Sequence, residues 1–542
     1  MLHPFVPLAE RIIDALLDTD PVLARWSGDH RGDGVLPDYS HDAVSARIAM
    51  LKDASHALVQ LDDEGLTPQE AVDHTLLTRL VDRYLFEYDT LRSYRWNPLA
   101  HNPGPLLYAL LARQFAPAAE RLEPVVSRLE RLPDALATAR QVLTDCPTIH
   151  LETARTQYSG VVALVRDEVS KLVEEAGADT PRVQAAQQGA IAALRDFDGW
   201  LGVRLAETPA GTGRDPRLGR PMWEANLWHL LDSELSAAEL SDRAWARLDQ
   251  VTEQLRAAAA ELTGGPPDDR TARLALDRIA DTHPTDDTIV GLARDALAET
   301  TAYVAEHELV TLIDDPCEIV VMPEFARGVA VAYCDSPGPL EQAAVPTFYA
   351  ISPTPAGWSD DRITSYYREY NHQMVRNLTV HEAMPGHALQ LAHARRYAGS
   401  SRARAVCKSG SFVEGWAVYA EQMMIENGFG GPEVRLQQLK MQLRMTINAL
   451  LDQLVHCEGM TEADGMQLMR ERGFQEEGEA AGKWRRALLT AGQLSTYFVG
   501  YTEVSAIAAS RPSGTGLRQW HDAMLSHGSP SPRHLRSLLS RG

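Results

Sequence analysis

Apolar residues recur at intervals of three and four along most of the first 310 residues of the chain. The series Leu76, Leu77, Leu80, Val81 and Tyr84 is an example, and this spacing places its members on one face of an α-helix. Gly, Pro and Asp cluster at four breaks in the pattern, at residues 30–40, 97–105, 207–221 and 263–270. The sequence therefore predicts helices joined by loops. The longest break, 207–221, is either an internal boundary or a loop over one mouth of a cleft.

The texture changes between residues 317 and 352, where β-branched residues become frequent. Three short strands are expected, at Cys317–Met322, Val329–Tyr333 and Pro346–Ser352. Helical spacing returns from about residue 359 to about 508, and a short tail rich in Pro, Ser and Arg follows. The predicted fold class is mainly α with a small β-sheet. A helical region, 1–310, and a motif-bearing region, 311–542, are expected to form one integrated unit around a cleft.

Composition restricts the classes of function. The 542 residues carry 52 Lys and Arg against 74 Asp and Glu, a net charge of −22, and such a chain repels nucleic-acid phosphates and anionic lipid. We therefore expect no nucleic-acid partner and no membrane partner. Hydrophobic residues make up 44% and charged residues 23% of the chain, as in ordinary globular proteins.

Two further features predict a cytoplasmic location. The five cysteines are scattered without a CxxC pair, which suits reduced thiols. At the N-terminus no basic stretch precedes the apolar residues, and Glu10, Arg11 and Asp14 interrupt them, unlike a signal peptide. No run of about 18 uninterrupted apolar residues occurs elsewhere.

The segment with the most unusual chemistry contains His381, Glu382 and, six positions after the first histidine, His387. It is similar to the HExxH helix of zinc enzymes, in which two imidazoles one turn apart hold the ion and the Glu takes a proton from water. The spacing here is longer. Six residues of straight helix rotate by about 600°, which leaves the two histidines about 120° apart instead of about 40°.

Pro385 and Gly386 lie inside this interval and leave two interpretations open. Pro removes a helical hydrogen bond and Gly tolerates unusual dihedral angles, so a kink or bulge would return His387 to the side of His381. Alternatively, the Pro-Gly pair ends one helix and His387 only caps the next.

Two glutamates share a helix face further along the chain. Glu414 and Glu421 are seven residues apart in a stretch that also contains Phe412, Trp416 and Tyr419. Carboxylates buried among such neighbours need a partner, and a metal ion is one. An ordinary solvated face with two glutamates is the other interpretation.

Four segments in order resemble the bacterial family known as domain of unknown function 885: GDHRGDGVLPD (28–38), HEAMPGHALQ (381–390), FVEGWAVYAE (412–421) and RALLTAGQLSTYFVG (486–500). Residues 323–341 and 346–353 match its strand region, so the resemblance spans nearly the whole chain. That family is similar to zincin-like metallopeptidases of the thermolysin type. The resemblance therefore implies a zincin-like fold.

The resemblance also implies roles for individual residues. His381, His387 and Glu414 match the protein ligands of one Zn²⁺ ion, and Glu382 matches the general base. Tyr497 and Arg486 match residues that stabilise an oxyanion or bind a substrate carboxylate, and Gln493 belongs to the same motif. The strand Phe348–Ile351 is expected to lie along the cleft, where an extended substrate would add to its edge.

Three positions depart from the family pattern: Ala388, Ala487 and Ala491. The first replaces a second His, and the other two replace a Tyr and a Pro, which puts the substrate end of the cleft in doubt. The implied activity is zinc-dependent hydrolysis of a peptide or peptide-like amide, with a small peptide as partner. The alternatives are a metallohydrolase or lyase for a small amide-containing metabolite, and a metal-free helical binding protein without catalysis.

Overall fold

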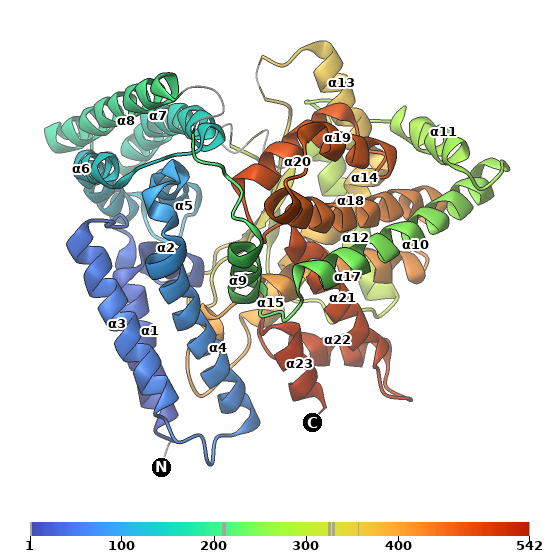
Figure 1. Cartoon of the computed structure of the whole chain (residues 1–542), viewed down its shortest axis with the longest axis horizontal. Coiled ribbons are helices and arrows are strands. Elements are labelled where there is room, and N and C mark those ends of the chain that lie inside the picture. The colour runs from blue at the N-terminus through green and yellow to red at the C-terminus, as the bar shows by residue number, and fades with distance from the viewer. Residues whose placement is uncertain (1–2, 209–212, 324–326, 328–330, 356, 541–542) are drawn as a thin grey trace. The chain divides into compact units, whose positions relative to one another are not determined.

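The computed structural model describes residues 3–208, 213–323, 327, 331–355 and 357–540 (Figure 1). Its contacts divide the chain into two compact units. The first contains residues 1–216, 337–345 and 398–407, and the second contains residues 217–336, 346–397 and 408–542. This division follows packing, whereas the expected regions 1–310 and 311–542 follow the change in residue composition.

The first unit is helical, and Figure 1 shows most of it in blue to green. Its α-helices are α1 (Phe5–Thr19), α2 (Pro21–Ser27), α3 (His41–Val59), α4 (Pro68–Leu85), α5 (Gly104–Ala112), α6 (Ala118–Val142), α7 (Thr148–Ala176), α8 (Pro181–Glu207) and α16 (Ala403–Val406). One π-turn, Phe86–Leu91, and three short 3₁₀ turns, His30–Gly32, Ser93–Arg95 and Pro98–His101, connect some of them. Leu76, Leu77 and Val81 are buried, as their periodic spacing predicts.

Two distant segments complete this unit. In residues 337–345, the backbone N–H of Leu340 donates to the carbonyl of Ser27 over 2.7 Å. In residues 398–407, the guanidinium of Arg402 pairs with Glu10 over 2.5 Å. Both segments therefore return to the N-terminal helices from the far half of the sequence.

The second unit contains the remaining helices and the sheet. Its α-helices are α9 (Arg220–Leu231), α10 (Ala237–Thr263), α11 (Asp269–Ala280), α12 (Ile289–Glu306), α13 (Asp360–Glu369), α14 (His372–Glu382), α15 (His387–Ala394), α17 (Gly410–Glu426), α18 (Gly431–Glu458), α19 (Glu462–Glu471), α20 (Glu477–Leu489), α21 (Ser495–Ala509), α22 (Leu517–Leu525) and α23 (Pro532–Leu539). Helix α18 contains buried residues on all sides, and it packs against α10, α14 and α21. Among the described residues, no helix combines the length and apolarity needed to cross a bilayer.

The sheet has three strands in the order β1-β3-β2. Strand β1 (Cys317–Val321) pairs in parallel with β3 (Thr347–Ile351), and β3 pairs antiparallel with β2 (Ala332–Asp335). Strand β3 is the central strand, and Tyr349, Ala350 and Ile351 are fully buried. The expectation that a substrate adds to the edge of Phe348–Ile351 is therefore wrong, because neighbouring strands already occupy both edges of β3.

The predicted class, mainly α with a small sheet, is confirmed. The first and third expected strands are present, and the second begins at Ala332, while residues 329 and 330 of that expectation lie outside the described residues. The tail after residue 508 is not without structure, since it forms α22 and α23. These short helices bury Trp520, Met524 and Leu535 against the core of the second unit.

Helices α17 and α21 approach each other closely at two glycines. A Cβ atom on Gly415 would lie 2.4 Å from the backbone of Gly500, and one on Gly500 would lie 2.1 Å from the carbonyl oxygen of Ser411. Only residues without a side chain permit this separation. The contact places Glu414, next to Gly415, beside the turn of α21 that carries Tyr497.

We expect Gly415→Ala to lower the free energy of unfolding by about 1–3 kcal/mol or more, because the new methyl group overlaps the backbone of α21. Gly482→Ala is the matched control, since a Cβ there meets nothing within 4 Å and α20 is otherwise regular. That change is expected to raise the free energy of unfolding by about 0.5–1 kcal/mol. Urea-induced unfolding measures both, and equal stabilities of the two variants would contradict the close crossing.

Candidate metal centre

The helical path is interrupted between α14 and α15. The side chain of Asn371 accepts hydrogen bonds from the first N–H groups of α14, and the helix ends at Glu382. After the turn 383–386, α15 begins at His387. A Cβ atom on Gly386 would lie 1.9 Å from the carbonyl oxygen of His381, so the turn requires glycine at this position. The indole of Trp416 donates to the carbonyl of Pro385 over 2.9 Å and ties the turn to α17.

This arrangement combines parts of both sequence interpretations. Pro385 and Gly386 end one helix, and a second helix starts at His387, so the site is not built on a single kinked helix. The tight turn nevertheless brings the two histidines together. Their ring centroids are 4.7 Å apart and the ring planes are nearly perpendicular.

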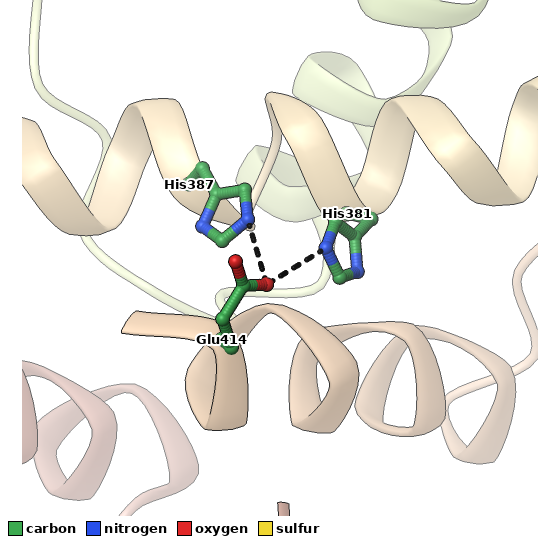
Figure 2. Close-up of side chains that lie close together, drawn as sticks. All are labelled: His381, His387 and Glu414. Carbon is green, nitrogen blue, oxygen red and sulfur yellow. Dashed lines mark ion pairs between the residues drawn. The ribbon is translucent and has the colours of Figure 1, made fainter. Parts of the chain in front are cut away.

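Glu414 on α17 completes the cluster (Figure 2). Its Oε2 atom lies 3.5 Å from Nε2 of His381 and 3.4 Å from Nε2 of His387. One ligand atom from each of the three residues lies within 4.8 Å of the others. Among the described residues, this is the cluster of His, Cys, Asp or Glu side chains close enough together to hold a metal ion. The sequence-predicted ligands therefore converge.

The spacing of these atoms fits a metal ion better than a hydrogen bond. Glu414 Oε2 is buried and has no hydrogen-bond partner in the described structure. Its distances to the two nitrogens exceed the usual length of a charge-assisted hydrogen bond, about 2.7–2.9 Å. Two ligands of a tetrahedral Zn²⁺, each about 2.0–2.1 Å from the ion, are separated by about 3.4 Å. The residues present thus fit the group that the sequence resemblance implies.

Electrostatics at the cluster favour positive charge beside the carboxylate. Burial opposes ionisation of Glu414, but the charge of His387 and the interactions with both imidazoles outweigh burial and lower the pKa of this carboxyl. Burial likewise disfavours the imidazolium of His381, yet Glu414 and Glu421 raise the pKa of His381 well above its ordinary value. A divalent cation would satisfy the same attraction.

Glu421 orients the first histidine. Its Oε1 lies 2.7 Å from Nδ1 of His381, and its Oε2 accepts a hydrogen bond of 2.6 Å from the amide of Asn377. Only 1% of Glu421 is exposed, so the two contacts hold a fully desolvated carboxylate. Nδ1 of His381 is thereby engaged, and Nε2 is the nitrogen that faces Glu414.

Glu382, the predicted base, is buried next to the cluster. It lines a cavity together with His381, His387 and Glu414. Burial raises the pKa of its carboxyl, and nearby imidazoles only partly offset this effect. The backbone N–H of Cys334 on β2 donates to it. Strand β2 therefore lies beside the candidate base.

The cavity has a volume of about 510 Å³ and is lined by residues of the second unit alone. All the predicted site residues lie on its wall: His381, Glu382, His387, Glu414, Arg486, Gln493 and Tyr497. The guanidinium of Arg486 donates to Gln493 over 2.7 Å and to the hydroxyl of Tyr497 over 3.2 Å. Interactions with Tyr497 and with the charge of Glu414 outweigh burial and raise the pKa of Arg486, so this guanidinium remains charged.

The departures from the family pattern lie elsewhere. Ala388, Ala487 and Ala491 are absent from the described wall of this cavity. Ala388 and Ala487 are buried in the core, and the carbonyl of Ala487 accepts a hydrogen bond from His456. The expected alteration of the substrate end by Ala487 and Ala491 therefore has no support from their positions.

Sequence reasoning missed further residues of this wall. Arg444 on α18 and Glu479 and Lys483 on α20 also line the cavity. The spacing from Glu479 to Lys483 and then Arg486 placed them on one helix face, which was a detectable signal. Their pairing with Arg444 was not detectable, because it depends on the packing of α18 against α20.

The comparisons with known proteins agree with the mainly helical fold. The family model described as "Bacterial protein of unknown function (DUF885)" matches residues 21–539. A solved structure from Shewanella oneidensis, described as "a putative lipoprotein of unknown function", is 28% identical over 99% of this chain and 100% of its own, with a TM-score of 0.82. The "putative lipoprotein" from Colwellia psychrerythraea is 17% identical over 99% of both chains, with a TM-score of 0.80.

Other comparisons add little. An M32 carboxypeptidase from Deinococcus radiodurans R1 aligns over 92% of both chains at 13% identity, but its TM-score of 0.22 carries no argument. Among curated proteins, none matches the chain significantly.

The expectation of a cytoplasmic location is corrected by these comparisons. Two structures that match nearly the whole chain are described as lipoproteins, which are anchored to membranes. The prediction rested on scattered thiols, on an N-terminus unlike a signal peptide and on the absence of a long apolar run. The first and the last of these test only for disulfides and for spanning helices. A lipid anchor requires neither of these features.

Removal of the Glu421 carboxylate tests the support of His381. We expect Glu421→Ala to lower the free energy of unfolding of chelator-treated protein by about 2–5 kcal/mol, since His381 and Asn377 lose a buried acceptor. Glu426→Ala, on the same helix but exposed, is the control and should change it by less than about 0.5 kcal/mol. If urea unfolding shows the two variants to be equally stable, Glu421 does not hold the histidine.

Proposed function

The chain belongs to the DUF885 family of bacterial proteins, and we propose that it is a metal-dependent hydrolase that cleaves a peptide or peptide-like amide bond. The observation that carries this proposal is the buried Oε2 of Glu414, which has no hydrogen-bond partner and faces two imidazole nitrogens at 3.4 and 3.5 Å. A zincin-like fold is part of the proposal and rests on the motifs of the sequence.

His381, His387 and Glu414 would hold the ion, and Zn²⁺ is the ion proposed. Bound by two neutral imidazoles and one carboxylate, with a position left open, Zn²⁺ supplies Lewis acidity and a water molecule of lowered pKa. Glu421 keeps His381 in the orientation that presents Nε2 to the site.

Glu382 is the proposed general base. Its carboxyl lies in the cavity beside both histidines. Burial raises the pKa of this carboxyl toward neutral pH, and a base with a pKa near the operating pH both accepts and returns a proton efficiently. Glu382 would take the proton of the attacking water and deliver it to the leaving nitrogen. The N–H of Cys334 fixes the carboxyl in place.

Tyr497 and Arg486 are proposed to act on the substrate carbonyl and on charge beyond it. The hydroxyl of Tyr497 is held by Arg486 on the wall of the same cavity. A hydroxyl so placed stabilises negative charge on an oxygen of the tetrahedral intermediate. An extended substrate would have to pair with β2, the edge strand whose residues 332–334 line the cavity.

The size of the cavity favours short substrates. A volume of about 510 Å³ is typical of sites for small molecules. The proposed substrate is therefore a small peptide, and a small metabolite with an amide bond is the second candidate on the same observation.

Metal analysis and hydrolysis of a short-peptide library test the proposal. Protein purified without chelator and reloaded with Zn²⁺ should bind one ion per chain and cleave a peptide. His387→Ala should lose the ion, because one of three ligands is removed. Glu382→Gln should keep the ion and lose activity by a factor of at least about 10².

The same measurements separate the alternatives. A Glu382→Gln variant with full activity would remove the assigned base. A chain that binds no divalent metal and cleaves nothing would be the metal-free binding protein, and the hydrolase proposal would be wrong. Cleavage of amide metabolites without cleavage of peptides would select the second candidate.

A further inference from the structure

Helix α20 forms one wall of the cavity and carries two of its basic residues, Lys483 and Arg486. Glu479, Lys483 and Arg486 follow at steps of four and three residues, so their side chains share one face of the helix. Arg444 reaches the same wall from α18. The wall thus contains three basic side chains and one carboxylate from these four residues.

The carboxylate of Glu479 is shared among several partners. Oε2 of Glu479 accepts a hydrogen bond of 2.8 Å from the hydroxyl of Tyr370, and its Oε1 forms a close ion pair with Arg444. Nζ of Lys483 is 3.7 Å from the same Oε1, which is an ion-pair distance but too long for a hydrogen bond. Glu479 therefore compensates Arg444 well and Lys483 only weakly.

Lys483 is consequently a buried amine whose N–H groups donate no hydrogen bond in the described structure. Only 5% of Lys483 is exposed. In the described structure, its ammonium group has one polar contact, the ion pair with Glu479. Burial, assisted by Arg444, lowers the pKa of Lys483 well below its ordinary value. An anion in the cavity would supply a closer counter-charge to Lys483 than the carboxylate of Glu479 does.

Arg486, one turn further along α20, forms no ion pair with a carboxylate among the described residues, although the charge of Glu414 acts on it over a longer distance. Its hydrogen bonds go to the neutral oxygens of Gln493 and Tyr497. Arg444 likewise donates hydrogen bonds to the hydroxyl of Tyr370. Of the three cations, Lys483 is therefore the one that makes no hydrogen bond in the described structure.

The same helix leaves space beside these cations. Gly478 and Gly482 line the cavity, and a Cβ atom on either would meet nothing within 4 Å. Glycine inside a helix costs up to about 1 kcal/mol relative to alanine, and neither residue has a positive φ or a close backbone contact that requires it. Their effect is to keep the wall open next to Lys483.

From these contacts we infer that Lys483, together with Arg444 and Arg486, forms a subsite for a carboxylate of the substrate. This inference rests on the proposed function and narrows its substrate class to amides that carry a free carboxylate. The carboxylate is either the C-terminus of a short peptide or an acidic side chain. Lys483 is the residue that determines the preference, because its ammonium group makes no hydrogen bond in the described structure, whereas Arg444 and Arg486 both donate hydrogen bonds.

Equilibrium binding to the full chain tests the subsite without turnover. Three probes are titrated by calorimetry into the Glu382→Gln protein with Zn²⁺ added: Ala-Ala-Ala, its C-terminal amide, and Ala-Ala-Glu with an amidated C-terminus. We expect at least one carboxylate-bearing probe to bind at least tenfold more tightly than Ala-Ala-Ala amide. Tight binding of the first probe or of the third identifies the C-terminal or the side-chain carboxylate.

Variants at Lys483 decide whether this residue is responsible. Lys483→Met should reduce the preference to less than about threefold, and Lys483→Arg should retain it. Arg362→Met is the control, because that guanidinium lines the cavity but is exposed and stacks on Trp358 at 3.7 Å. It should leave the preference unchanged. Thermal unfolding of each variant confirms that the comparison is made between folded proteins.

The subsite and the hydrolase can fail separately. Equal binding of all three probes, binding of none, or an undiminished preference in Lys483→Met would overturn the subsite, whatever activity the unmodified protein has. A preference that depends on Lys483 in a protein that hydrolyses nothing would support the subsite and refute the hydrolase.

Discussion

The carboxylate of Glu414 between two imidazoles is the interaction on which the interpretation of this molecule depends. A buried carboxylate oxygen is costly unless it is paired, and here both nitrogens stand at 3.4 and 3.5 Å, beyond hydrogen-bond length. A cation between the three atoms removes that cost. Without a cation, protonated histidines must balance the charge of the carboxylate. The pKa of His381 is accordingly raised and the pKa of Glu414 lowered.

Backbone geometry keeps these side chains together, and glycine is essential to it at three places. Gly386 permits the tight turn that brings His387 next to His381. Gly415 and Gly500 permit α17 and α21 to touch, which sets Glu414 beside the helix that carries Tyr497. The polar residues of the site are thus positioned by residues that have no side chain.

The sequence predicted the components of the site better than their arrangement. The periodic apolar residues identified the helices, because burial of one face imposes a spacing that is local in the chain. Two of the proposed ligands and the proposed base were recognisable because His381, Glu382 and His387 lie close together in sequence, whereas Glu414 was assigned through the family resemblance. Whether the ligands converge was not decidable, since the turn at Pro385–Gly386 depends on contacts with α17, which lies more than twenty residues away.

Features that depend on distant parts of the chain were missed for the same reason. Strand β3 is central only because β2, which precedes it, adds on the side opposite β1. The attachment of residues 337–345 and 398–407 to the N-terminal helices leaves no periodic signal. Helices α22 and α23, of nine and eight residues, are flanked by Gly, Pro and Ser, which resemble a loop in composition.

The distribution of charge in the cavity connects the chemistry with the choice of substrate. Glu382, Glu414 and Glu421 cluster where a cation would lie. Arg444 of α18 lies on another wall of the cavity with Lys483 and Arg486 of α20. A substrate with a polarised amide at one place and a carboxylate at the other would meet complementary charge at both. A neutral substrate of the same size would leave Lys483 with only its weak ion pair to Glu479, and the cost of burying this amine would then reduce the affinity for that substrate. The overall charge of −22 has no bearing on this preference, because short-range contacts inside a cavity outweigh the screened field of the surface.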